Sequence, residues 1–265
     1  MKIFCSLLVC VLVLSTATPA QSPYRLSWEK DGIILGSGAA VSILGYSLEQ
    51  KINPLSVQEI EALSRNNINA FDRSATYHWS KNLMTGSDAG VVLMMLSPLS
   101  LFLDNNVRKD FQTISAMYFE TMLFAVFLPS IAKRATERVR PFIYNEQTPL
   151  QDKLDVEARK SFFSGHTTVA FASAVFLSTV YDGYFPDSKY KNYVWAGSLL
   201  TASITGYLRY ASGAHFPTDI LAGAVAGSAV GCLIPYLHKT NDRRSELFPT
   251  LNQSNGFTIH YLFQF

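Results

Sequence analysis

The chain has 265 residues, of which 48% are hydrophobic and 16% are charged, against about 25% charged in a typical soluble domain. This composition excludes a disordered or collagen-like chain, and a formal net charge of +2 gives no reason to expect a nucleic-acid partner. The mean hydropathy of +0.14 fits either a large buried core or a membrane protein.

The N-terminal residues 1–20 have the pattern of a secretory signal peptide. Lys2 precedes the apolar stretch Ile3–Leu14, and small residues then lead to Ala20. Twelve apolar residues are few for a bilayer span, so we expect a signal peptide, with a short uncleaved anchor as the alternative. After cleavage Cys232 is the remaining cysteine, and its apolar neighbours predict a small core residue.

Six apolar segments follow, each nearly free of charge and too long for an ordinary strand. They are Gly32–Leu48, Ala89–Leu103, Thr113–Ala132, Thr167–Tyr181, Tyr193–Leu208 and Ile220–Leu237. We therefore predict an all-α domain over residues 21–245, a bundle of about six core helices. In the last segment Gly223, Gly227 and Gly231 recur every fourth residue, which favours close contact with another helix.

Residues 246–265 form a C-terminal tail with a different pattern. Apolar residues alternate with other residues from Phe257 to Phe265, a period of two that predicts one short β-strand.

The first polar cluster, Lys133 to Pro141, ends the third apolar segment. On a continuous helix, Lys133 and Arg140 would lie on one face about 10 Å apart along the axis. They could then converge on one anion. A solvated basic helix face is the alternative.

The second cluster, Ser164-Gly165-His166, comes just before the fourth apolar segment. Ser164 is placed as a helix N-cap, and the first turn of a helix offers backbone N–H groups to an anion. Gly165 permits close approach of a ligand to the backbone. An ordinary cap beside a bystander histidine is the alternative.

The third cluster lies between the fifth and sixth segments and contains Arg209, His215 and Asp219. Ser212-Gly213 is expected to break the chain so that Arg209 and His215 both point inward. A carboxylate four residues after a histidine can fix its tautomer and leave the other nitrogen free as a nucleophile. A capping Asp or half of a metal site is the alternative, but no metal-binding companion lies near His166 in the sequence.

Together the clusters resemble those of the type 2 phosphatidic acid phosphatase and vanadium haloperoxidase superfamily. The shared patterns are Lys-six residues-Arg-Pro, Ser-Gly-His, and Arg-five residues-His-three residues-Asp. Two positions depart from the family: Phe163 replaces a Pro before Ser-Gly-His, and Leu208 replaces a Ser before Arg209. Neither departure removes a charged or proton-transferring group.

The resemblance implies a metal-independent phosphatase that hydrolyses the phosphate monoesters or diphosphates of lipids. The reaction would pass through a phosphohistidine intermediate and need no cofactor. His215 would attack phosphorus, Asp219 would orient it, and His166 would protonate the leaving oxygen. The phosphate-binding residues would be Lys133, Arg140, Ser164, Gly165 and Arg209.

Three alternatives remain at this point: a vanadate-dependent haloperoxidase, a soluble periplasmic non-specific acid phosphatase acting on small phosphoesters, and a non-enzymatic envelope protein. We expect an exported protein of the bacterial cell envelope, with membrane-associated helices and a periplasm-facing site. A cleaved signal followed by six spans would instead place the motifs in the cytoplasm. This conflict with a periplasm-facing site is resolved if the signal-like segment and the first apolar segment do not both count as assumed, if one segment does not span the membrane, or if the bundle is soluble.

Overall fold

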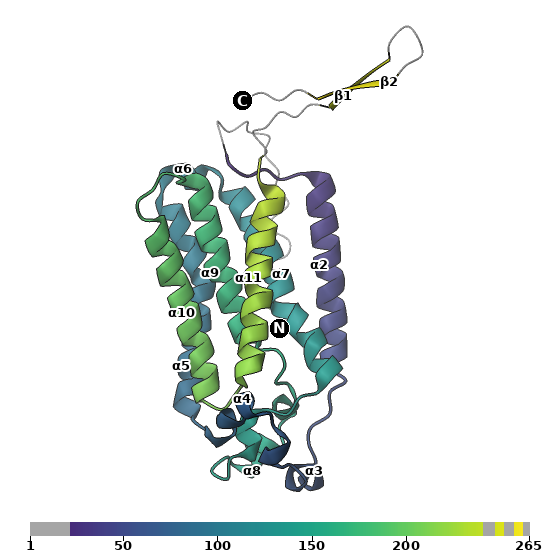
Figure 1. The fold of residues 1–265 in the computed structure, drawn as a ribbon, viewed down its shortest axis with the longest axis vertical. Helices are drawn as coiled ribbons and strands as arrows, with labels where there is room; N and C mark the ends of the chain where they lie inside the picture. The colour runs from purple at the N-terminus through teal and green to yellow at the C-terminus, as the bar shows by residue number, and fades with distance from the viewer. Residues whose placement is uncertain (1–21, 241–246, 252–256, 262–265) are drawn as a thin grey trace.

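The computed structural model describes residues 22–240, 247–251 and 257–261 and is built mainly of helices (Figure 1). The predicted signal peptide, residues 1–20, lies outside the described residues. Long helices run side by side along the long axis of the molecule. They are α2 (Trp28–Glu49), α5 (Lys81–Leu96), α7 (Phe111–Thr136), α9 (Gly165–Tyr184), α10 (Lys191–Ala211) and α11 (Pro217–His238). The all-α prediction and its six core segments are confirmed.

Short elements lie at the two ends of this bundle. We call the end at which α2, α7 and α10 finish and α9 and α11 begin the motif end, and the other the opposite end. The motif end carries α3 (Val57–Glu61), η1 (Arg65–Asn67), α4 (Ala70–Arg73), η2 (Ser74–Tyr77), η4 (Pro141–Tyr144), α8 (Leu150–Lys153) and η5 (Val156–Arg159). At the opposite end η3 (Ser97–Leu103) continues α5 and leads into α6 (Asn105–Lys109).

Helix α9 is the central helix, and 11 of its 20 residues are buried. Helix α11 packs closely against it. A Cβ added at Gly227 would collide with the carbonyl oxygen of Thr168, and one at Gly231 would collide with that of Ala172. The close helix contact predicted from the four-residue glycine spacing is therefore confirmed.

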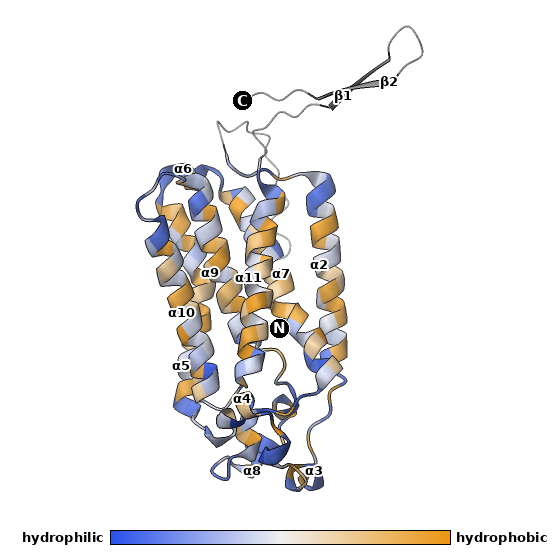
Figure 2. Ribbon diagram, in the orientation of Figure 1, coloured by the Kyte–Doolittle hydropathy of each residue, from blue (hydrophilic) through white to orange (hydrophobic). Residues whose placement is uncertain are grey.

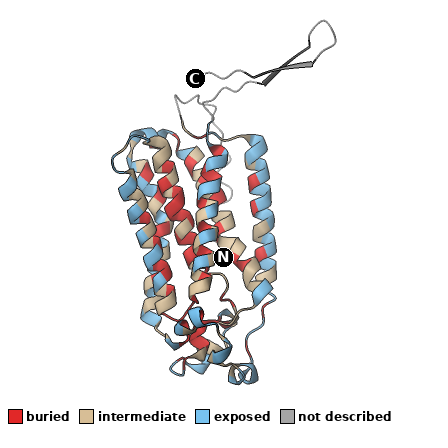
Figure 3. Cartoon of the chain, in the orientation of Figure 1, coloured by how far each residue is buried: buried red, intermediate tan, exposed pale blue. Residues whose placement is uncertain are grey.

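The long helices of the bundle consist largely of hydrophobic residues (Figure 2). Within the described residues, four helical segments are long and apolar enough to cross a membrane, and they are α2, Lys81–Leu103, α7 and α11. Large side chains such as Ile33 on α2 and Val225 on α11 are more than two-thirds exposed, as in a protein whose helices face lipid (Figure 3). The composition and the exposed apolar surface are thus those of a membrane protein.

The prediction for Cys232 is wrong, because its side chain is exposed on α11 rather than packed in the core. Helix α11 is apolar on every side, so hydrophobicity alone does not show which of its faces is covered by protein.

The C-terminal tail contains two strands. β1 (Leu247–Leu251) pairs antiparallel with β2 (Phe257–Tyr261), with Leu247 opposite Tyr261 and Leu251 opposite Phe257. The predicted strand is therefore confirmed over 257–261, and it has a partner strand that the pattern did not indicate. Residues 262–265, the rest of the predicted alternation, lie outside the described residues.

Candidate functional site

The first motif bends at the end of α7 and does not continue as a helix. Glu137 ends α7 in a left-handed conformation with φ of 41°, and Arg140 follows in extended backbone just before Pro141. The prediction that Lys133 and Arg140 share a helix face is wrong. The residue before a proline is disfavoured in the α conformation, which explains the extended backbone of Arg140.

Lys133, Arg140 and Arg209, which we call the basic cluster, each lie next to a carboxylate. Lys133 Nζ is 3.6 Å from Glu49, Arg140 NH2 is 3.0 Å from Glu157, and Arg209 NH1 is 3.4 Å from Asp88.

Both arginines of the basic cluster are deeply buried, with Arg140 8% exposed and Arg209 5% exposed. Among the described residues nothing accepts a hydrogen bond from Nε of Arg140 or from Nε of Arg209. A buried donor without an acceptor is costly, so these two atoms are suited to an anion that enters from outside.

The second motif forms the first turn of α9. Ser164 is the N-cap, as predicted, and its Oγ accepts from Thr167 N at 3.4 Å. A Cβ at Gly165 would meet no protein atom closer than 3.9 Å. The fold therefore does not itself require glycine there, and the missing side chain leaves space next to the helix N-terminus.

His166 is partly open to solvent and pairs with a residue far away in sequence. Its Nε2 lies 2.9 Å from Oδ1 of Asp88 on α5. A carboxylate can only accept, so Nε2 carries the proton of this hydrogen bond. The same Asp88 oxygen accepts from Arg209, so one carboxylate links the second and third motifs.

The third motif turns sharply after α10. The helix ends at Ser212, and Gly213 adopts a φ of 75°; a Cβ there would collide with the carbonyl oxygen of His78. This break, which was predicted, leaves Arg209 and His215 both buried.

Asp219 stands in the first turn of α11, completely buried below His215. Its Oδ2 accepts from Ser161 Oγ at 2.5 Å and from Phe216 N at 2.9 Å, and its Oδ1 accepts from Arg138 at 2.5 Å. These bonds fix the carboxylate beside the imidazole.

His215 Nδ1 faces Asp219 Oδ2 at 3.6 Å, just beyond hydrogen-bond distance, and nothing else among the described residues bonds to it. Burial lowers the pKa of His215 well below its usual value, against the opposing effect of Asp219, and the charges of Arg140 and Arg209 lower it further. The imidazole is therefore neutral near pH 7, with Nδ1 directed at a carboxylate. This is the state in which the other ring nitrogen has a free lone pair.

All the catalytic and phosphate-binding residues expected from the sequence lie at the motif end. Arg140 is close enough to interact electrostatically with Lys133, Arg209, His166 and His215. Ser164 N donates to the backbone oxygen of Asp219 at 3.1 Å, which joins the second motif to the third. The cluster can neutralise a tetrahedral anion and offers it a neutral histidine.

The site contains further residues that the sequence interpretation missed. Asp88 holds His166, Arg138 bridges Asp219 and Asp72, and Glu49 pairs with Lys133. Arg138 lies inside the first basic run, so that run was the available signal. Asp88 is 78 residues from His166, and no local pattern connects them.

Comparison with known proteins identifies this arrangement. The family model described as the PAP2 superfamily matches residues 115–243, which include all three motifs. This match confirms the resemblance to the PAP2 superfamily that the motifs indicate. It is 28% identical over 179 residues to a lipid A 1-phosphatase of Rhizobium etli, which covers 60% of this chain and 71% of that protein.

A solved structure, the first transmembrane PAP2 type phosphatidylglycerolphosphate phosphatase from Bacillus subtilis, is 22% identical to this chain. The match has a TM-score of 0.46 and covers 76% of this chain and 94% of that one.

Proposed function

We propose that this protein is a metal-independent lipid phosphatase that hydrolyses phosphate monoesters or diphosphates through a phosphohistidine intermediate. The observation that carries the proposal is the pair of buried arginine Nε atoms, on Arg140 and Arg209, that have no acceptor among the described residues. They lie beside a neutral, buried histidine. The similarity to a lipid A 1-phosphatase favours a phosphatase over a haloperoxidase or a non-enzymatic envelope protein.

In the proposed reaction the free nitrogen of His215 donates its lone pair to phosphorus, and Asp219 stabilises the imidazolium that forms. The bond from phosphorus to the leaving oxygen breaks, and the oxygen keeps the electron pair and takes a proton from His166. His166 then removes a proton from water, which attacks phosphorus and releases phosphate from His215. The first half-reaction changes the charge of both histidines, and the second returns both to their starting charges.

The basic cluster, Ser164 and the backbone N–H of Gly165 would bind the non-bridging phosphate oxygens. The charge on these oxygens is spread over several donors in the transition state, and removing one such donor typically costs about 10² to 10³ in rate. Glu49, Glu157 and Asp88 form ion pairs with the basic cluster. The pKa of Glu157 lies below its usual value despite burial, because Arg140 and a hydrogen bond from Lys160 favour the carboxylate.

An apolar cavity supports a lipid substrate. It has a volume of about 320 Å³, contains none of the motif residues, and is lined by side chains of α2, α5, η3 and α7 that include Met95, Phe102 and Phe127. Phe127 precedes Lys133 by six residues, about 9 Å along α7. A lipid whose phosphate contacts Lys133 could thus place an acyl chain in this cavity.

The test uses the full chain in detergent with EDTA present. Release of phosphate from phosphatidic acid, a simple phosphorylated lipid, is compared with release from p-nitrophenyl phosphate. We expect turnover of the lipid to exceed that of the small ester, and to be lost in His215→Ala and in His166→Ala but not in Arg108→Gln, an exposed arginine at the opposite end. Turnover that persists in both histidine variants contradicts the proposal.

The bundle also constrains the topology. Residues 22–27 lie at the opposite end, where Tyr24 pairs with Lys239. If the bundle spans a membrane, the start of the described chain and the motif end face opposite sides. We propose that the motif end faces the periplasm, as expected from the sequence. In this orientation Ser22, at the opposite end, faces the cytoplasm. Residues 1–20 would then not act as a signal peptide that exports Ser22.

Labelling intact cells with a membrane-impermeant maleimide tests this orientation. The background replaces Cys5, Cys10 and Cys232 with serine, and the probes are Lys51→Cys at the motif end and Lys109→Cys at the opposite end, both exposed positions. We expect Lys51→Cys to react and Lys109→Cys to react only after lysis. The reverse pattern contradicts the orientation and favours a signal peptide.

A further inference from the structure

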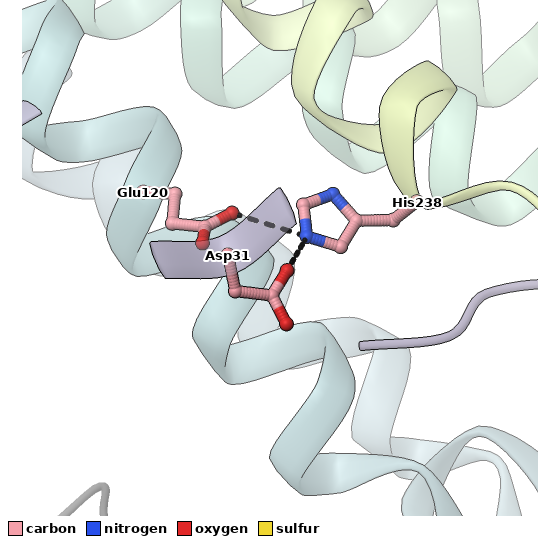
Figure 4. A group of neighbouring side chains, drawn as sticks. All are labelled: Asp31, Glu120 and His238. Carbon is pink, nitrogen blue, oxygen red and sulfur yellow. Dashed lines mark hydrogen bonds and ion pairs between the residues drawn. The ribbon is translucent and has the colours of Figure 1, made fainter. Parts of the chain in front are cut away.

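Three ionisable side chains from three helices meet at the opposite end, away from the PAP2 motifs (Figure 4). Asp31 lies in the first turn of α2, Glu120 lies on α7, and His238 is the last residue of α11. His238 Nε2 is 2.7 Å from Oδ1 of Asp31 and 3.3 Å from Oε2 of Glu120. We call these residues the three-helix cluster.

The hydrogen bonds around His238 determine which of its nitrogens is free. Nδ1 is 2.8 Å from the carbonyl oxygen of Ile234, and a carbonyl can only accept, so Nδ1 carries a proton. In the neutral ring, Nε2 then directs a lone pair at the two carboxylates. Three electron-pair donors therefore converge on one point, which is unfavourable unless a positive species lies between them.

Glu120 is the group that most needs a partner. It is 1% exposed, and neither of its carboxylate oxygens receives a hydrogen bond from any described residue. Within the described ranges no lysine or arginine forms an ion pair with Asp31 or Glu120. A buried carboxylate without hydrogen bonds or a cationic partner is strongly disfavoured, and coordination of a metal ion is a standard way to satisfy it.

We propose that the three-helix cluster binds one divalent transition-metal cation of the Zn²⁺ class. One imidazole nitrogen and two carboxylate oxygens form a donor set that suits Zn²⁺ and leaves a fourth position for water. All three ligand atoms lie within 4.8 Å of one another. Tetrahedral bonds of about 2.0 Å separate ligands by about 3.3 Å, so Asp31 Oδ1 would move outward by about half an ångström on binding.

The surroundings of the cluster already orient two of the ligands. Ser27 N donates to Oδ2 of Asp31 at 2.6 Å, which leaves Oδ1 to the metal, and Ile234 holds Nδ1 of His238. Outer hydrogen bonds of this kind fix the tautomer and orientation of metal ligands. The cation would join α2 to α7 and α11 at the end where Arg25 N also bonds to His238 O. It would therefore act on the stability of the fold, and we expect it to take no part in the reaction at the motif end.

Metal binding to the purified full chain in detergent tests this proposal directly. The protein is prepared through a tag without histidine, stripped with EDTA, dialysed and titrated with Zn²⁺. We expect about one high-affinity Zn²⁺ per chain and a rise in the thermal midpoint. Glu120→Gln should weaken binding about tenfold or more, while Glu29→Gln, in the same turn of α2 as Asp31, should bind like the wild type.

A second measurement keeps the test decisive if Glu120→Gln does not fold. Co²⁺ bound by nitrogen and oxygen ligands in a tetrahedral site gives visible absorption bands, which should appear in the wild type and disappear in Asp31→Asn. Equal Zn²⁺ affinity in wild type and Glu120→Gln, or no Zn²⁺-dependent rise in the thermal midpoint, overturns the proposal. A loss of stability in Glu120→Gln without metal also overturns it, since it indicates that Glu120 already has a favourable partner, such as a proton shared with His238.

Discussion

The basic cluster at the motif end and the three-helix cluster at the opposite end are both buried, but they leave opposite kinds of atom without a partner. At the motif end the unpartnered atoms are N–H donors of Arg140 and Arg209, and at the opposite end they are carboxylate oxygens of Glu120. The first arrangement suits an anion and the second a cation. Helix α11 connects the two, with Asp219 in its first turn and His238 as its last residue.

The two regions also differ in whether their charged side chains have partners of opposite charge. Each member of the basic cluster has a carboxylate within 4.0 Å, so the site is stable before phosphate arrives. Asp31 and Glu120 have only His238 as an ion-pair partner among the described residues. In the proposed mechanism, phosphate would replace these carboxylates as the partner of the basic cluster, whereas the cation proposed for the three-helix cluster would remain bound.

The largest effect is expected from a substitution in the basic cluster, at Arg209. Arg209→Gln removes a buried donor that the proposed mechanism places on phosphate, so kcat for the lipid phosphate should fall by about 10² to 10³. The matched change Arg108→Gln alters an exposed arginine at the opposite end and should leave kcat within about twofold of the wild type. Steady-state phosphate release measures both, and equal losses in the two variants contradict a specific role for Arg209.

A smaller effect is expected at Asp88, which holds His166. Asp88→Asn keeps the size of the side chain but removes the carboxylate that accepts from Nε2, so kcat for the lipid should fall by about 10 to 10². The loss should be smaller with p-nitrophenyl phosphate, because its leaving group needs no proton. The control is Asp187→Asn, an exposed aspartate at the opposite end. An equal loss on both substrates contradicts a role in orienting the general acid.

The smallest expected effect is on stability and follows from the buried His215. Its pKa in the folded chain is lowered by burial and by Arg140 and Arg209, so below about pH 6.5 only the unfolded chain binds this proton. Folding stability should therefore decrease as the pH falls below about 6.5, by at most about 1.4 kcal/mol per pH unit from this group. Thermal midpoints in detergent should show a shallower acid slope in His215→Gln. The same slope in both proteins contradicts the lowered pKa.

The apolar segments predicted the six long helices because each one is long, uncharged and bounded by polar residues. The motif residues lie together because they stand at helix ends that meet at one end of the bundle. Pairings between distant residues could not be predicted. Asp88 and His166 are 78 residues apart, and Asp31 and His238 are 207 residues apart, so only the packed helices bring them together.

Two local predictions failed for reasons that the structure explains. Arg140 was expected on a helix face shared with Lys133, but the left-handed Glu137 and the proline after Arg140 end the helix first. Cys232 was expected in the core, but an all-apolar helix gives no signal for which side faces its neighbours. In both cases the residue type was informative, but the sequence did not predict the direction of the chain or which face of the helix is covered.

The central claim is that His215 carries the phosphoryl group during turnover, and trapping the intermediate tests it most directly. The protein in detergent is mixed with a ³²P-labelled lipid phosphate, quenched in alkali within one turnover, digested and mapped by mass spectrometry. We predict acid-labile phosphate on His215 in the wild type. With ³²P-labelled p-nitrophenyl phosphate, whose leaving group needs no proton, we predict more of it in His166→Ala because hydrolysis then lacks its general base. Turnover without covalent phosphate on His215, or phosphate on another residue, would contradict the account.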